Sequence, residues 1–417
     1  MTHYRLSTLD NGLRVITEEM PALRSVSVGC WVDTGARDER ANEAGASHFL
    51  EHLLFKGTEE ISARQISETF DGMGAESNAF TSKEQTCYWA RLVDDDLPVG
   101  LGLLSEMLQR PAFRQSEIDS ERQVVFEEIN MREDDPQDSA FEAFSRTVLD
   151  GHALGRPVLG TRESIGAMTR ADLKGYWRRR YGPNSVVVAV AGAVRHTEVR
   201  DLVAELFGEW GGGEVGHDFS PNVPSASVGL VERDTEQAHL VLGGAGIDRT
   251  DERRWAFGVL NLVLGGGMSS RLFTSIREER GLAYAIFSFG HSYADSGVWG
   301  IYAGTTPRQT AEVMEVIDGQ LSMLMEDGIT DAELEKARGA ARGALALAME
   351  DSQSRMVHLG REEICGLEHL SMDERLERIL AVDRAEVTEV ARQVFSGPKT
   401  LGVVGPFAES DLTGYVT

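Results

Sequence analysis

The feature that most constrains the fold is a repeat that spans the chain at a fixed offset. Asp38-Glu39-Arg40 recurs as Asp251-Glu252-Arg253, at an offset of 213, and Gly192 recurs at the same offset as Gly405. Self-similarity at a fixed spacing indicates repeated structural units. The 417 residues also exceed what one hydrophobic core usually organises. We therefore expect two domains that are copies of one unit.

Each copy is expected to combine helices with strands. Residues 4–18 are predicted to form a hairpin because alternating segments flank Asp10-Asn11-Gly12, and an Asn-Gly pair favours a tight turn. The continuous apolar run 185–192 predicts a buried strand. Further predicted strands are 25–33, 75–80, 85–93, 228–233, 238–244, 283–292, 296–304 and 400–405, and predicted helices include 42–56, 97–110, 116–133, 137–149, 170–180, 251–264 and 269–280. The predicted fold class is α+β, with two homologous α/β-sandwich domains whose mixed or antiparallel sheets are flanked by helices.

The boundary between the copies is expected in residues 211–225. This segment is rich in Gly, Pro and Ser and lacks a periodic apolar pattern, which is typical of a linker. The predicted domains are therefore residues 1–210 and 226–417.

The charge balance excludes some classes of partner. Lys and Arg number 41 and Asp and Glu number 67, which gives a formal net charge of −26. A phosphate backbone or an anionic membrane surface needs clustered cations, so we expect neither nucleic acid nor membrane as a partner. The acidic residues would favour basic substrates if they lined a cleft, but a solvated surface that keeps the protein soluble also accounts for them.

The cysteines and the N-terminus indicate a cytoplasmic location. Cys30, Cys87 and Cys365 lie far apart without CxxC spacing, so the sequence predicts neither a disulfide framework nor a cysteine metal site. The first residues lack the apolar core of a signal peptide, and no segment reaches about 18 consecutive apolar residues.

One candidate site has metal-ligand spacing. His48, Glu51 and His52 share one face of the predicted helix 42–56, because positions i, i+3 and i+4 align in a helix. Two imidazoles one turn apart can bind one zinc ion, and a catalytic zinc site has three protein ligands plus an open position for water. A third protein ligand is therefore required. The five-residue pattern alone also fits an ordinary solvated face of a charged helix.

The predicted helix 116–133 offers the third ligand. Glu121 and Glu128 are seven residues apart and share one face of this helix, whereas Glu127 does not. We take Glu128 as the ligand and Glu121 as a carboxylate that orients a ligand histidine through its other ring nitrogen. Glu51 then remains free to take a proton from a water molecule activated by the zinc and to pass it to a leaving amine, which is the chemistry of amide hydrolysis.

These segments resemble the pitrilysin family of zinc peptidases. The likeness is to the branch of the catalytic subunit of mitochondrial processing peptidase and its bacterial relatives, and it covers nearly the whole chain. Residues 45–58 (GASHFLEHLLFKGT) resemble the metal helix of this family, whose HxxEH signature is that of the inverzincins, and residues 121–128 (ERQVVFEE) resemble its second ligand segment. The offset of 213 places His48, Glu51 and His52 on Asn261, Leu264 and Gly265, so the second copy is expected to lack a metal site.

The resemblance also implies residues that contact substrate. Residues 74–81 (GAESNAFT) resemble an edge strand that pairs with an extended peptide, through Asn78, Ala79 and Phe80. An ordinary core strand with Phe80 buried is a compatible interpretation. Residues 277–284 (REERGLAY) resemble a family segment whose Arg and Tyr, here Arg277 and Tyr284, reach the metal site and donate to the substrate or the reacting carbonyl.

The predicted function is that of a zinc endopeptidase with one Zn²⁺ per chain. The resemblance implies that the two domains enclose a cavity, which would restrict substrates to oligopeptides or unfolded peptides. It also implies a dimer, either a homodimer or a heterodimer with an inactive homologue. The alternatives are a non-catalytic or assembly subunit of a related peptidase complex and a zinc hydrolase of non-peptide amides.

Overall fold

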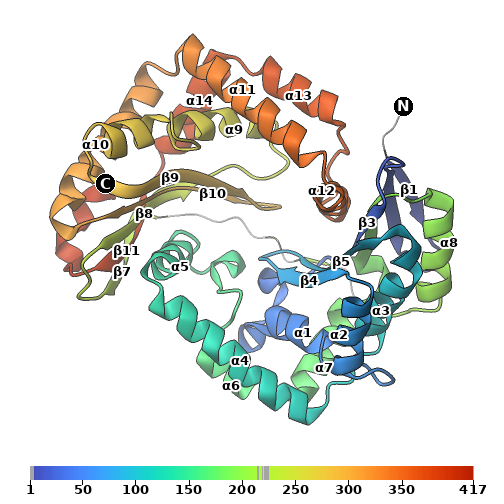
Figure 1. The fold of residues 1–417 in the computed structure, drawn as a ribbon. Coiled ribbons are helices and arrows are strands. Elements are labelled where there is room, and N and C mark those ends of the chain that lie inside the picture. The colour runs from blue at the N-terminus through green and yellow to red at the C-terminus, as the bar shows by residue number, and fades with distance from the viewer. Residues whose placement is uncertain (1–3, 214–215, 218, 220–224, 417) are drawn as a thin grey trace. The chain divides into compact units, whose positions relative to one another are not determined.

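The computed structural model describes residues 4–213, 216–217, 219 and 225–416 (Figure 1). Its residue contacts divide the chain into two compact units. The first unit contains residues 1–129, 156–218 and 346–371, and the second contains residues 130–155, 219–345 and 372–417. Part of the linker predicted for residues 211–225 lies outside the described residues.

The first unit is built on a six-stranded mixed sheet. Its strands lie in the order β1 (Arg5–Thr8), β2 (Arg14–Glu19), β6 (Val186–Gly192), β3 (Ser25–Val32), β5 (Thr86–Val93) and β4 (Glu76–Thr81). Only β2 and β6 pair in parallel. The predicted hairpin is confirmed as β1 and β2, with Gly12 at a φ of +92° in the turn. Because helices cover both faces at β6, all of its residues are buried, as the apolar run predicts.

Helices from distant parts of the sequence cover the two faces of this sheet. One face packs against α1 (Ala46–Leu54), α3 (Leu97–Gln109) and α8 (His196–Phe207) in the main core. The other face packs against α12 (Ser352–Ile364), through Met356 and Leu359 on Trp31 and Val187. Thus α12 belongs to the second copy in sequence but lies beside β3 and β6 of the first unit (Figure 1).

The second unit has a five-stranded sheet in the order β7 (Ser227–Glu232), β11 (Thr400–Gly405), β8 (Ala238–Ala245), β10 (Gly297–Thr305) and β9 (Ala283–Ser292). One face packs against α9 (Arg254–Leu264), α10 (Thr310–Glu326) and α14 (Arg384–Phe395). The other face packs against α5 (Pro136–Val148), whose Ala140 and Phe144 belong to the same buried cluster as Val241 and Val404. This helix belongs to the first copy in sequence.

The two units confirm the predicted repeat and the α+β class. Strands β2 and β3, shifted by the offset found in the sequence, coincide with β7 and β8, and the order β2-β6-β3-β5-β4 corresponds to β7-β11-β8-β10-β9. Helices α5 and α12 are also equivalent in order, at a slightly larger offset of 216 residues that relates Pro136 to Ser352. The two compact units differ from the expected copies at two segments. Residues 130–155 come from the first copy but lie in the second unit, and residues 346–371 come from the second copy but lie in the first unit.

Two predicted helices have different bounds in the structure. The helix predicted for residues 42–56 is interrupted at Gly45, whose φ of +88° separates the 3-10 turn η2 (Ala41–Glu43) from α1. The helix predicted for residues 269–280 is shorter and contains a π-helical turn, η6 (Phe273–Glu278). Periodicity in the sequence indicates that a helix has an apolar face, but it does not reveal a glycine with positive φ or a local change of helix type.

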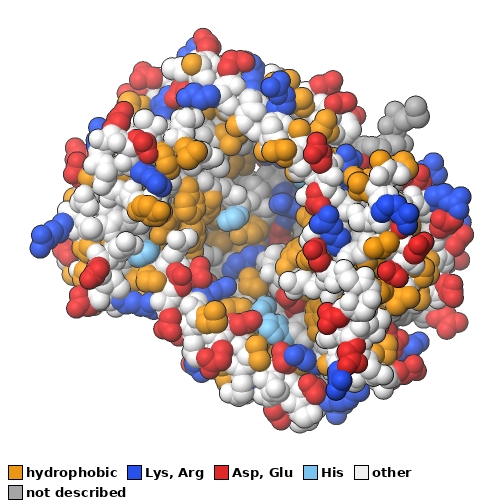
Figure 2. Space-filling view, in the orientation of Figure 1, with side chains coloured by type: hydrophobic (Ala, Val, Ile, Leu, Met, Phe, Trp, Pro, Cys, Tyr) orange, Lys and Arg blue, Asp and Glu red, His pale blue; other side chains and the backbone are white. Residues whose placement is uncertain are grey.

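Charged residues of both signs are spread over the surface. On the face shown in Figure 2, acidic side chains are interspersed with Lys and Arg, which agrees with a solvated surface there. Among the described residues, no helix is long and apolar enough to cross a membrane.

Candidate metal centre

Helix α1 carries the HxxEH motif and is anchored at its N-terminus by Glu39. The Glu39 carboxylate accepts hydrogen bonds from the backbone N–H groups of Gly45 and Ser47, each at 2.8 Å. These two N–H groups lie where a helix leaves donors without intrahelical partners. The apolar face of α1 is buried through Phe49, Leu50, Leu53 and Leu54. That packing leaves His48, Glu51 and His52 on the opposite, partly exposed face.

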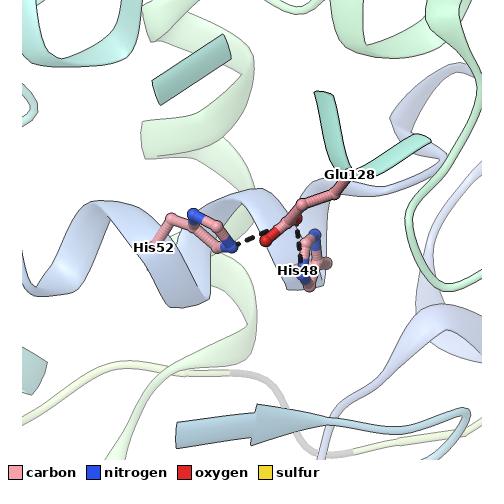
Figure 3. Close-up of side chains that lie close together, drawn as sticks. All are labelled: His48, His52 and Glu128. Atoms are coloured by element: carbon pink, nitrogen blue, oxygen red, sulfur yellow. Dashed lines mark ion pairs between the residues drawn. The ribbon is translucent and has the colours of Figure 1, made fainter. Parts of the chain in front are cut away.

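The long helix α4 (Gln115–Asp134) brings two glutamates to this face of α1. The Nε2 atoms of His48 and His52 each lie 3.5 Å from Oε2 of Glu128. Figure 3 shows the two imidazoles on α1 and the Glu128 carboxylate directed toward one another. One ligand atom from each residue lies within 4.8 Å of the others, and no other such group of His, Cys, Asp or Glu occurs among the described residues.

The donor set fits a tetrahedrally coordinated zinc ion. Two ligand atoms bound at about 2.0–2.1 Å in tetrahedral geometry are about 3.4 Å apart, and the two His–Glu separations are 3.5 Å. Oε2 of Glu128 is buried and accepts no hydrogen bond from the described residues. A buried carboxylate oxygen without a hydrogen-bond donor is costly unless a cation compensates it. His48, His52 and Glu128 can therefore hold a metal ion.

Glu121 lies behind His52, about two turns before Glu128 along α4. Its Oε2 atom is 3.2 Å from Nδ1 of His52, and its Oε1 atom is 2.8 Å from Nζ of Lys56. A proton on Nδ1 of His52 would be donated to Glu121, and Nε2, the ring nitrogen that faces Glu128, would then be available to bind a cation. Sequence reasoning missed Lys56, which lies in the turn just after α1, four residues after His52.

Glu51 is oriented by a residue that sequence reasoning did not identify. Oγ1 of Thr81, at the end of β4, donates a hydrogen bond to Oε2 of Glu51 at 2.5 Å. Burial raises the pKa of the Glu51 carboxyl above its ordinary value, while the hydrogen bond from Thr81 and the neighbouring His52 oppose that increase. The separation of 30 residues between Thr81 and Glu51 leaves no local pattern from which this contact could be recognised.

The candidate substrate strand β4 is an edge strand that lies against α1. It pairs only with β5, so its outer row of backbone N–H and C=O groups has no strand partner within the described part of the first unit. Asn78 and Phe80 are exposed and Ala79 is half-buried. Phe80 is 37% exposed and contacts Trp31 edge to face, so the interpretation of Phe80 as a buried core residue is wrong.

Arg277 and Tyr284 lie in the second unit and contact each other. Arg277, in η6, donates from its guanidinium to the backbone oxygen of Tyr284 at 2.8 Å and stacks over the Tyr284 ring at 4.7 Å. Tyr284 is on the edge strand β9 and is 79% exposed. Their action at the metal centre stays a prediction. The residues at the corresponding positions of the second copy, Asn261, Leu264 and Gly265, lie at the end of α9.

Comparison with known families decides the family of the chain. Residues 14–162 match the family described as insulinase (peptidase family M16), and residues 167–340 match the domain described as the peptidase M16 inactive domain. This chain belongs to peptidase family M16. The pitrilysin-like zinc peptidase family predicted from the sequence is therefore confirmed.

Similar proteins of this M16 family occur in several bacteria. An uncharacterized zinc protease of Streptomyces coelicolor is 43% identical over 97% of this chain and 90% of its own length. A protein of Mycobacterium tuberculosis that is also named a zinc protease is 44% identical over 96% of this chain and 93% of its own length. Another, from Bacillus subtilis, is 40% identical over 96% of this chain and 97% of its own length.

Solved structures show the same fold. A crystal structure of a protease from Helicobacter pylori has a TM-score of 0.90 at 23% identity and covers 97% of this chain and 99% of that chain. A peptidase M16 inactive domain from Pseudomonas fluorescens has a TM-score of 0.91 at 20% identity, with coverage of 97% and 98%. Both likenesses concern the fold alone.

Proposed function

We propose that this M16 protein is a zinc-dependent endopeptidase with one Zn²⁺ ion per chain. The observation that carries the proposal is the convergence of His48, His52 and Glu128 beside Glu51, a carboxylate that is not part of the ligand set. The zinc protease names of the Streptomyces and Mycobacterium relatives, which are 43% and 44% identical, support the same metal. When bound, zinc would polarise the substrate carbonyl and lower the pKa of a coordinated water to about 7.

The residues of the chain would perform the proton transfers and the positioning. Glu51 takes a proton from the water molecule whose oxygen forms a bond to the scissile carbonyl carbon. It then delivers this proton to the amide nitrogen as the C–N bond breaks, so that one carboxylate acts as base and then as acid. Glu121 fixes the ring of His52 through Nδ1, and Lys56 fixes Glu121.

The edge strand β4 supports a peptide as substrate. An extended chain could pair with the outer backbone groups of β4 near Asn78, Ala79 and Phe80, which would select for extended backbone more than for particular side chains. The proposed substrates are therefore oligopeptides or unfolded segments. Arg277 and Tyr284 would donate to the substrate or to the developing oxyanion. The cytoplasmic location, the enclosed chamber and the homodimer, or a heterodimer with an inactive homologue, stay proposals.

Paired substitutions test the mechanism against its alternatives. Glu51→Gln should retain stoichiometric zinc and lower the cleavage of a quenched fluorogenic peptide by about 10²–10⁴-fold, because only the proton transfer is lost. Glu128→Gln and His52→Ala should lose zinc as well as activity, whereas Glu127→Gln, a neighbour on another face of α4, should retain both. Metal content by mass spectrometry, read beside the cleavage rate, separates these classes.

Each alternative predicts a different result. A non-catalytic subunit would bind zinc but cleave no peptide in a mixed library. A hydrolase of non-peptide amides would cleave small amides while leaving every peptide intact. Full peptidase activity in Glu51→Gln would contradict the proposed mechanism directly.

A further inference from the structure

The hydroxyl of Thr81 is the one hydrogen-bond donor to the general base of the proposed reaction among the described residues. Its Oγ1 atom lies 2.5 Å from Oε2 of Glu51. A carboxylate accepts hydrogen bonds through both oxygens, and a threonine hydroxyl has a single proton to donate. The contact therefore occupies Oε2 and leaves Oε1 of Glu51 for a water molecule.

Thr81 is itself held in a rigid part of the first unit. It is the last residue of β4 and pairs with Thr86 of β5 across the ladder. In the turn that follows, the Ser82 hydroxyl donates to the backbone oxygen of Gln85 at 2.9 Å and accepts from the backbone N–H of Gln85 at 3.0 Å. A buried ion pair between Arg37 and Glu84 fixes the same turn. The β-branched side chain adds a restricted χ1 angle.

We propose that Thr81 is a positioning residue that couples the edge strand β4 to the Glu51 carboxylate. This inference rests on the proposed function. A peptide that pairs with β4 adds to the same strand whose last residue orients the base, so substrate binding and the alignment of Glu51 share one rigid element. Without the hydroxyl, the Glu51 carboxylate loses its fixed orientation, and a misplacement of about 1 Å in a reacting group can reduce a rate by about 10²-fold.

Three variants of the full-length protein separate positioning from stability. Thr81→Val removes the hydroxyl and keeps the branched shape, and it should lower kcat by about 10–100-fold with KM within about 2-fold and zinc unchanged at one per chain. Thr81→Ser keeps the donor and should remain within about 3-fold of the wild type. Thr86→Val removes the hydroxyl of the cross-strand neighbour, which donates to the backbone oxygen of Thr34, and should lower Tm while leaving kcat within about 2-fold.

The outcomes decide the inference whether or not the proposed function is correct. A wild-type kcat in Thr81→Val, or an equal loss in Thr81→Ser, would overturn it. If the zinc-loaded wild type cleaves no peptide, the proposed function fails, and crystal structures then test the contact itself. We expect the Glu51 carboxylate to occupy one position in the wild type and Thr81→Ser and to leave it in Thr81→Val. An identical Glu51 position in all three structures would refute the positioning role.

Discussion

The packing of α12 on the first sheet depends on the absence of a side chain at Gly360. A Cβ atom at this position would lie 2.0 Å from Nε1 of Trp31 and 2.4 Å from both Cδ1 and Cε2. Trp31 is 1% exposed and sits in the core between α12 and the sheet, so its ring has little room to move. We therefore predict that Gly360→Ala forces α12 away from the sheet and destabilises the first unit.

The magnitude follows from two opposing effects. Overpacking a close-packed core costs about 1–3 kcal/mol, and approaches near 2.0 Å, far inside the usual carbon contact distance of about 3.5–4.0 Å, place this case at the upper end of that range. Replacing Gly by Ala inside a helix gains about 1 kcal/mol. The free energy of unfolding should thus fall by about 2 kcal/mol.

Urea unfolding followed by Trp fluorescence provides the measurement. The matched control is Gly343→Ala in α11 (Asp331–Ala348), where a Cβ atom would meet nothing within 4 Å. That variant should gain only the higher helix propensity of Ala, so its free energy of unfolding should rise by about 0.5–1 kcal/mol. Equal stabilisation by Gly360→Ala would show that α12 does not pack on Trp31 and would refute the reasoning.

Three further predictions concern charge and metal. Burial lowers the pKa of His217, but hydrogen bonds to Asp33 and Asp38 outweigh burial and raise it to about 9. The protonated imidazole therefore stabilises the folded state, fully below about pH 6.5 and progressively less as the pH rises through 9. The wild type should therefore lose about 1–2 kcal/mol of unfolding free energy between about pH 6 and 10 relative to His217→Gln, and parallel urea profiles would contradict this. Glu39→Gln replaces one of two acceptors at the start of α1 by a donor and should cost about 1–3 kcal/mol in urea unfolding, whereas unchanged stability would argue against the cap. Chelation should lower Tm in the wild type, with recovery on adding Zn²⁺, and should leave Tm unchanged in Glu128→Gln.

The repeat and the strands could be predicted because both depend on patterns along the chain. One offset relates β2 to β7 and β3 to β8 in the structure as it relates the matching segments in the sequence. The start of α1 was predicted too early, at residue 42, because the backbone at Gly45 adopts a positive φ and the helix begins only at Ala46.

The exchange of α5 and α12 between the copies could not be predicted. An amphipathic pattern shows that a helix has an apolar face, but it does not indicate which sheet that face covers. Gly360 helps to explain why α12 packs on the first sheet, because its lack of a side chain leaves room for Trp31. This fit is evident only once the fold is known, since Trp31 lies far earlier in the chain.

The sequence by itself determined the candidate metal-ligand pair on α1 and the candidate glutamates on α4. Helical spacing is a local property, so His48 and His52 had to share a face, as did Glu121 and Glu128. Tertiary structure decided how the two faces meet: Glu128 lies opposite both Nε2 atoms, and Glu121 lies behind His52. Tertiary structure alone placed the Thr81 hydroxyl on Glu51, because a hydrogen bond between a strand end and a helix depends on the packing of elements that no local pattern relates.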